Sequence, residues 1–148
     1  MKKLAVLALG LLTCAALSGR VAAEDKKADA PKIEGKWTLV SGKKNGSDID
    51  ENSKKSTYTA TKDKITIEGE GTKFVMGYKI DEKNPKNVDL EILESPIADI
   101  KGMKALGIIE VKGEEMKLAY STEKDKRPKD FEGKEGFYFE LKKEKAKE

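Results

Sequence analysis

The sequence contains no histidine and one cysteine, Cys14, so the side chains able to do chemistry are mainly carboxylates, hydroxyls and amines. Without histidine, neither a Ser-His-Asp triad nor a Cys-His pair can be assembled. A zinc ion would have to be held by carboxylates alone. We therefore expect a protein that is not an enzyme, has no catalytic residues, binds no metal and uses no cofactor.

Two groups of carboxylates lie close together in the chain. Asp89 and Glu91 could supply the pair of acids that a glycosidase uses, but they alternate with apolar residues and belong to the wet side of a predicted strand. Residues 48–52 (Asp-Ile-Asp-Glu-Asn) match the start of a calcium-binding loop. Ser53 and Thr59 stand where that loop needs a glycine and a closing glutamate. Both groups are therefore interpreted as solvated surface charges.

Residues 1–23 have the parts of an export signal. Two lysines precede an apolar run over residues 4–17, and small residues at 21–23 form a cleavage site, so the mature chain should begin near Glu24 and be secreted or periplasmic. The run is shorter than the roughly 20 residues that span a bilayer, and we expect no transmembrane segment after cleavage. The alternative is a lipoprotein anchored through Cys14, although Thr13 departs from lipoprotein signals.

Cleavage would also change the charge balance. The full chain has 30 basic and 27 acidic residues, and the signal contains three basic residues and no acidic ones, which leaves 27 of each. Basic and acidic side chains are interspersed, whereas a nucleic-acid surface needs a basic patch. We expect no nucleic-acid partner. The remaining 125 residues suit one domain, and without Cys14 that domain would have no disulfide.

Apolar residues recur at every second position in short runs, which is typical of antiparallel strands. The predicted strands are 36–41, 56–61, 64–68, 73–80, 87–93, 105–111, 116–121 and 137–142. Most connections between them are short, which favours an up-and-down meander, and closure into a barrel removes the exposed edges. The sequence therefore predicts an all-β fold, an eight-stranded antiparallel up-and-down barrel, with a two-sheet sandwich as the alternative.

The segments outside the strands complete the predicted organisation. Residues 24–32 are small and charged and predict a flexible leader, the barrel domain covers 33–143, and 144–148 predict a charged tail. The polar segment around Asn45-Gly46 can hold one helical turn. The connection 95–103 is longer and carries three apolar side chains, which need a core or a partner.

An eight-stranded barrel is wide enough either to be filled by side chains or to hold one small ligand. We expect the interior to be lined by Tyr58, Phe74, Met76, Tyr78, Leu90, Ile108, Leu118, Tyr120 and Phe139. With Ile97, Ile100 and Met103 of the long connection, they are the candidate residues for binding a small apolar or amphipathic ligand at an open end. If they fill the core instead, the alternative is an envelope or extracellular module that binds a protein partner, such as an inhibitor. An internal void of a few hundred cubic ångströms would distinguish the two.

Trp37 is the only tryptophan, and Arg127 is the only arginine after the signal. Because a guanidinium group stacks on an aromatic face, we predict that Arg127 packs over Trp37 and closes one end of the barrel. A Gly-x-Trp sequence on the first strand, here Gly35-Lys36-Trp37, together with a late arginine resembles the lipocalin and calycin pattern.

A wider stretch of the chain carries a second resemblance. Residues 33–41 (IEGKWTLVS), 107–111 (GIIEV) and 126–131 (KRPKDF) are similar, in order and spacing, to an uncharacterised family of small exported domains in planctomycetes. The resemblance covers about 33–143 and implies a lipocalin-like barrel, without catalytic residues to carry over. Ile109 stands where an aromatic residue is expected, and the 95–103 connection is more apolar than the glycine-rich segment expected there.

Overall fold

The computed structural model describes residues 30–145. The predicted signal with its cleavage site, most of the leader and the end of the tail lie outside the described residues. The strands are β1 (Gly35–Lys44), β2 (Ser47–Asp48), β3 (Thr57–Ala60), β4 (Lys64–Gly69), β5 (Thr72–Ile80), β6 (Asn87–Glu94), β7 (Lys104–Lys112), β8 (Glu115–Ser121) and β9 (Phe137–Lys143). The helical turns are α1 (Glu51–Lys54) and the 3-10 helix η1 (Ala98–Ile100).

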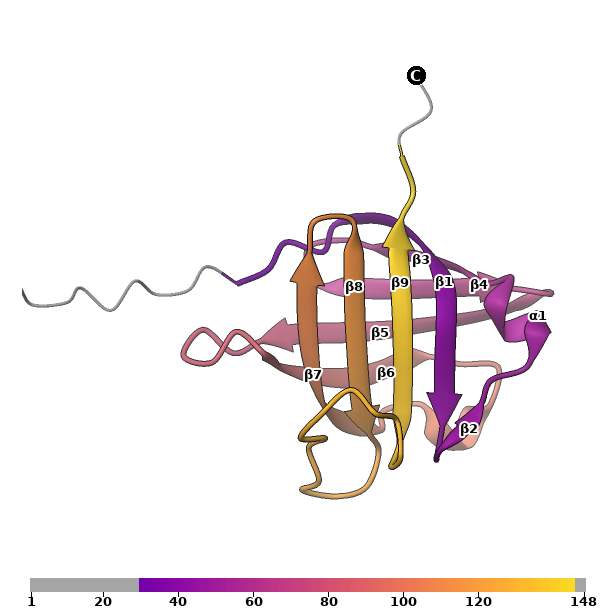
Figure 1. Ribbon diagram of the computed structural model, residues 1–148. Helices are drawn as coiled ribbons and strands as arrows, with labels where there is room; N and C mark the ends of the chain where they lie inside the picture. Colours follow the sequence, from indigo (N-terminus) through magenta and orange to yellow (C-terminus); the bar gives the residue numbers. More distant parts are fainter. Residues whose placement is uncertain (1–29, 146–148) are drawn as a thin grey trace, which may run out of the picture.

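The sheet closes into a barrel because β1 pairs on both sides. Its first residues pair with β3, and most of its length pairs with β9, while β3 to β9 each pair with the next strand along the chain. All pairings are antiparallel, and β2 pairs only with the end of β1, so the closed barrel has eight strands. In Figure 1, β7, β8, β9 and β1 form a front layer that crosses β3 to β6 behind it. The predicted eight-stranded meander is confirmed, as is the helical turn after Asn45-Gly46.

One end of the barrel, at the top of Figure 1, is covered by the chain that enters β1. Ile33 in this segment is fully buried, and the indole Nε1 of Trp37 donates a hydrogen bond of 2.8 Å to its carbonyl oxygen. Gly35 has a φ of +129°, and a Cβ atom there would lie 3.0 Å from Cε of Lys143. Glycine thus lets the chain turn into β1 while Lys143 packs closely against it. We call this the closed end.

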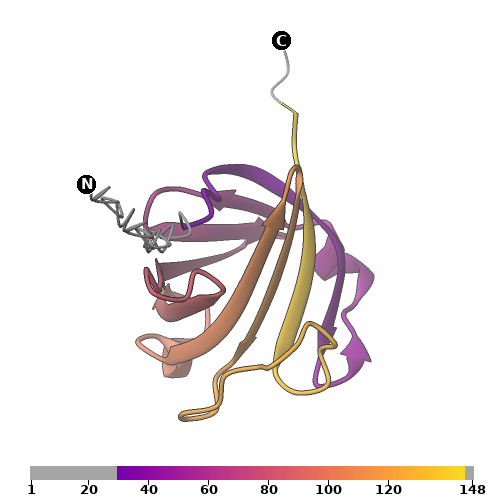
Figure 2. The same ribbon diagram turned by 60° about the vertical axis from the view of Figure 1, so that its left-hand side comes forward.

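The opposite end carries the longer connections, and we call it the loop end. At the bottom of Figure 1 the turn from β1 to β2, the connection from β6 to β7 and the connection from β8 to β9 lie together. The last of these, residues 122–136, crosses the outside of the barrel wall, as Figure 2 shows, and we call it the strap. Its Gly133 and Gly136 carbonyls accept hydrogen bonds of 2.7 Å and 2.8 Å from the amides of Gly46 and Asn45.

The interior holds the main core, a cluster of 16 buried residues that includes Trp37, Leu118 and Leu141 and contains no charged side chain. Full burial of one such large aliphatic side chain stabilises the fold by about 1.5–3 kcal/mol. A smaller cluster lies on the outer face, where Phe131 of the strap covers Ile108, Ala119 and Tyr138. The strap therefore adds a second apolar layer to this part of the wall.

Candidate functional site

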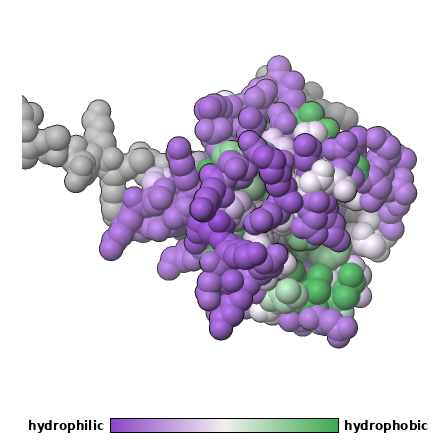
Figure 3. Space-filling model, turned by 60° about the horizontal axis from the view of Figure 1, so that its bottom comes forward, coloured by the Kyte–Doolittle hydropathy of each residue, from purple (hydrophilic) through white to green (hydrophobic). Residues whose placement is uncertain are grey.

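Apolar side chains on the inner face of the barrel are partly exposed at the loop end. Ile67, Ile92 and Phe137 pack against the core from positions near the ends of their strands, and Phe74 is paired with Ile67 across β4 and β5. Ile49 also packs against the core, and its Cδ1 atom would lie 2.7 Å from a Cβ atom at position 42, near the end of β1. We call these five side chains the mouth. Figure 3, which brings this end of the molecule forward, shows an apolar patch among charged side chains.

Two buried tyrosines lie behind the mouth. Tyr58 comes from β3 and Tyr120 from β8, and their ring centroids lie 6.1 Å and 5.9 Å from that of Phe139. Tyr120 also stacks on Phe137 of the mouth, with ring centroids 4.9 Å apart. The two tyrosines are 5% and 9% exposed. Four aromatic rings therefore form one continuous group from the core to the loop end.

The hydroxyl groups of Tyr58 and Tyr120 have no hydrogen-bond partner among residues 30–145. Every side-chain oxygen in this part of the chain that is fully shielded from water has a hydrogen-bond partner. Since these two hydroxyls have none, each must be within reach of a water molecule. Burial raises the pKa of each hydroxyl above its ordinary value of 10.0, and for Tyr120 the charge of an ionised Tyr58 adds to this effect. Both groups are therefore protonated at neutral pH and able to donate a hydrogen bond.

A lysine lies at the edge of the mouth. Lys44 is paired with Phe137 across β1 and β9, and its Nζ atom lies 5.4 Å from the centroid of the Phe137 ring. Its side chain is exposed. A cation over an aromatic ring at an exposed site contributes about 0.5–1 kcal/mol. The mouth is therefore an apolar opening with the positive charge of Lys44 at its rim.

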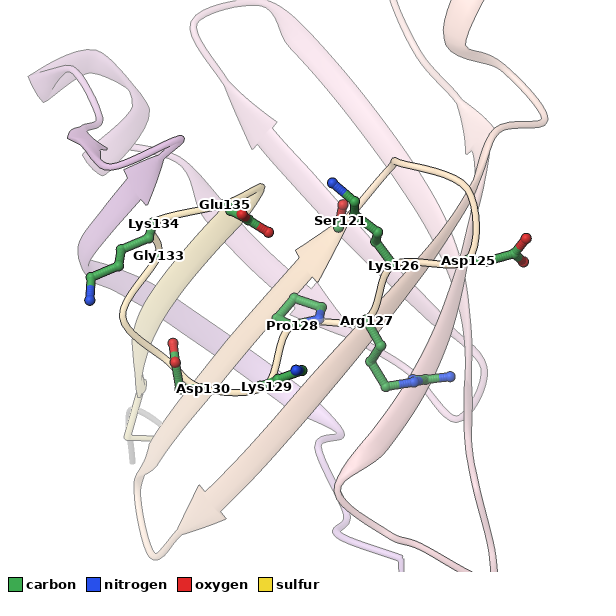
Figure 4. A pocket seen from close by; sticks show the side chains of 10 residues that line it. All are labelled: Ser121, Asp125, Lys126, Arg127, Pro128, Lys129, Asp130, Gly133, Lys134 and Glu135. Atoms are coloured by element: carbon green, nitrogen blue, oxygen red, sulfur yellow. The ribbon is translucent and has the colours of Figure 1, made fainter.

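A separate hollow of about 550 Å³ lies in the strap, outside the barrel. Its lining is mostly charged, and Figure 4 shows Arg127 pointing away from Asp130 and Glu135 on the other side of the hollow. Lys126 and Lys134, which also line it, form ion pairs with neighbouring glutamates of the strap. A hollow with a mostly charged lining does not suit an apolar ligand.

The structure gives the predicted lining residues three different environments. Six are buried in the core: Tyr58, Met76, Leu90, Leu118, Tyr120 and Phe139. Phe74 belongs to the mouth, whereas Tyr78 is partly buried and donates a hydrogen bond of 2.6 Å to the carbonyl of Thr61, in the turn before β4. Ile97, Ile100 and Met103 lie in the connection at the loop end, where Ile97 is 53% exposed and the other two are partly buried.

The prediction that Ile108 lines the interior is wrong. Ile108 belongs to the outer cluster under Phe131, and Gly107 and Ile109 on either side of it face inward. The run 105–109 is apolar or small at every position, so its alternation does not identify the inner face. The apolar Ala119 and Tyr138, between inward residues of β8 and β9, were the signal that the outer face is also covered.

The predicted pairing of Trp37 with Arg127 is also wrong. The cation over Trp37 is Lys143, whose Nζ atom lies 5.6 Å from the ring. Arg127 lies in the strap and donates hydrogen bonds of 3.0 Å and 2.5 Å to the carbonyls of Val88 and Gly107. Its other nitrogen, Nη2, lies 2.6 Å from a carboxylate oxygen of Asp89. Trp37 does help to close one end, but Arg127 fastens the strap to β6 and β7.

Of the five side chains of the mouth, the sequence predicts only Phe74 as a binding residue. Phe137 and Ile92 continue alternating patterns and could have been found from them, but Lys44 could not. A bulge in β1 leaves Val40 unpaired and shifts the alternation, so the residues after it change face. The predicted strand ends at residue 41, whereas β1 continues to Lys44.

Comparison with family models, with curated proteins and with solved structures finds no match to this chain. Within residues 30–145 there is no helix that is both long and apolar enough to cross a membrane. In the same range, no three acidic, histidine or cysteine side chains come together as a group able to hold a metal ion.

Proposed function

We propose that this protein is an exported, non-enzymatic binding barrel whose mouth takes one small apolar or amphipathic molecule. The observation that carries the proposal is the mouth itself, where inward-facing Ile67, Phe74, Ile92 and Phe137 are partly exposed to water. Covering apolar surface is worth about 25 cal/mol for each Å² removed from water. A molecule seated on these side chains would gain that energy, and this is the physical basis of the proposal.

The packing of the core sets a limit on the ligand. The 16 buried side chains occupy much of the interior, and the hollow of about 550 Å³ belongs to the strap rather than to the barrel. The proposed ligand is therefore held at the loop end and reaches inward only as far as Tyr58 and Tyr120. The proposal therefore does not include a wide, lipocalin-type cavity that encloses a large ligand, although the resemblance to lipocalins still supports a binding role.

Export is proposed from the amino-terminal segment. Its two lysines, its apolar run and its small residues at 21–23 support cleavage before Glu24. The mass of the exported protein tests this directly, because a cleaved chain beginning at Glu24 is expected. A mass that retains Cys14 with an added lipid would instead support a lipoprotein.

Native mass spectrometry of the protein purified gently from its own exported pool tests the binding role. We expect a stoichiometric adduct that solvent extraction releases. Phe74→Asp, which places a charge in the mouth, should abolish the adduct. Val40→Asp is the matched control, because Val40 is 53% exposed on the barrel wall, and this variant should keep the adduct. A clean apo mass for the wild type, or an adduct that survives in Phe74→Asp, would contradict the proposal.

A second candidate function is a protein-interaction module, possibly an inhibitor. The observation that favours it is Ile97, a large apolar side chain that is 53% exposed in the connection between β6 and β7. Exposed apolar side chains on a loop are typical of partner surfaces. A co-purified protein that is lost from an Ile97→Ser variant, with no small-molecule adduct, would favour this second function.

A further inference from the structure

Two hydroxyls inside the barrel are not accounted for by the fold. Tyr58 and Tyr120 are each more than nine-tenths buried, and neither hydroxyl has a hydrogen-bond partner among residues 30–145. Because water reaches both hydroxyls, each can exchange a bound water for an acceptor atom of a ligand. Tyr138, by contrast, has an outward hydroxyl that lies 3.3 Å from a carboxylate oxygen of Glu140.

The two hydroxyls belong to one site rather than to two. Both tyrosines contact Phe139, and an ionised Tyr58 would be close enough to raise the pKa of Tyr120. Tyr120 also stacks on Phe137, which belongs to the mouth. Through Phe137 and Phe139, both tyrosines therefore belong to the aromatic group that begins at the mouth.

The charges around the site favour an uncharged group. The core cluster contains no charged residue, and Lys44, the cation beside Phe137, is exposed at the rim. A carboxylate carried inward to the tyrosines would be desolvated without a counter-charge, which is costly. A ketone, ester or amide oxygen accepts two hydrogen bonds without that penalty.

We propose that the ligand of the mouth carries an uncharged hydrogen-bond acceptor, which the hydroxyls of Tyr58 and Tyr120 bind together while its apolar part rests on Ile67, Ile92 and Phe137. This inference rests on the proposed function, since it describes the chemistry of the same site. In this role the two tyrosines select one class of ligand, apolar molecules with a carbonyl oxygen.

Three probes of similar shape test the inference: butyrophenone, which has a ketone, butylbenzene, which has none, and phenylbutyrate, which is charged. Their affinities for the whole protein are measured by calorimetry at neutral pH. Each hydrogen bond to a neutral acceptor is worth about 1 kcal/mol, or about fivefold in affinity. Butyrophenone should therefore bind about 25-fold more tightly than butylbenzene, and phenylbutyrate more weakly than butyrophenone.

Variants separate recognition from a structural role. Tyr58→Phe and Tyr120→Phe should each weaken butyrophenone binding about fivefold and leave butylbenzene binding unchanged. Their melting temperatures should be unchanged, because neither substitution removes a hydrogen bond within residues 30–145. Tyr138→Phe is the matched control and should bind both probes as the wild type does.

The outcomes distinguish the inference from the function on which it rests. Equal binding of butyrophenone and butylbenzene overturns the inference and leaves the binding role intact. Tightest binding by phenylbutyrate also overturns it, because Lys44 would then select the ligand through its charge. Absence of binding by all three probes contradicts the proposed function as well.

Discussion

Each of the four tyrosines in the chain has a hydroxyl whose pKa is raised above 10.0, in every case mainly by burial. For Tyr138 the negative charge of Glu140 and a hydrogen bond to it add to burial and raise the pKa to about 12. The folded protein therefore holds these protons more tightly than the unfolded chain does. The stability that this provides is complete below pH 10 and is lost as the pH rises above it.

We predict that the two interior tyrosines make the fold sensitive to alkali. As the pH rises from about 9 to about 11, the free energy of unfolding should fall. Each of the two tyrosines should contribute up to about 1.4 kcal/mol to this fall for every pH unit above 10. Urea unfolding at both pH values checks this, and the double variant Tyr58→Phe, Tyr120→Phe should lose distinctly less stability than the wild type. An equal loss of stability in the two proteins would show that folding does not raise the pKa of these two hydroxyls.

Single residues also show where sequence alternation stops being informative. In β7, Gly107 faces inward, because a Cβ atom there would lie 3.0 Å from Cβ of Tyr120 and 3.2 Å from Cγ1 of Val88, which both belong to the main core. The larger apolar residues Leu106 and Ile108 flank Gly107, and from the sequence they are the ones expected to face inward. The sequence prediction for Ile108 is therefore wrong, whereas on the more clearly alternating β8 the predictions for Leu118 and Tyr120 are confirmed.

At the scale of elements, the strap is the part of the fold that the sequence did not predict. Its residues have no periodic pattern, and its position depends on contacts with β1, β6, β7 and β9 that are distant in the chain. Arg127 holds one part of it through two carbonyls and Asp89, and Phe131 holds another through the outer cluster. The strap is thus an ordered layer over the barrel wall.

Replacing Arg127 by lysine should release that part of the strap. Lysine cannot donate from a planar fork to Val88, Gly107 and Asp89 at once, and we expect a loss of about 2 kcal/mol in the free energy of unfolding. Asp89→Asn is the comparison, because the Asp89 side chain is 62% exposed and its ion pair contributes less than about 1 kcal/mol. Hydrogen exchange should rise within 122–136 in Arg127→Lys. A larger loss from Asp89→Asn than from Arg127→Lys would contradict this account.

The error over Trp37 and Arg127 also belongs to this scale, and topology could have prevented it. In an up-and-down barrel the first strand begins at the end where the last strand finishes. The connection before the last strand therefore lies at the other end, and so does Arg127. Lys143, at the end of β9, was the cation that the predicted meander brings to Trp37.

At the scale of the whole molecule, alternation and short connections were sufficient to predict a closed barrel of eight strands. They could not predict its mouth. Which inward side chains are exposed depends on where each strand ends relative to its neighbours, on the bulge in β1 and on the position of Ile49 over Gly42. These are properties of register and packing, which a single sequence does not specify.

The most direct test of the binding role is amide chemical-shift mapping of the whole protein during titration with butyrophenone. A ligand in the mouth should shift the amides around Ile67, Ile92 and Phe137 in a saturable way and leave those around Ile33 at the closed end unchanged. Shifts confined to residues 125–135 of the strap, or no saturable shifts, would contradict the account.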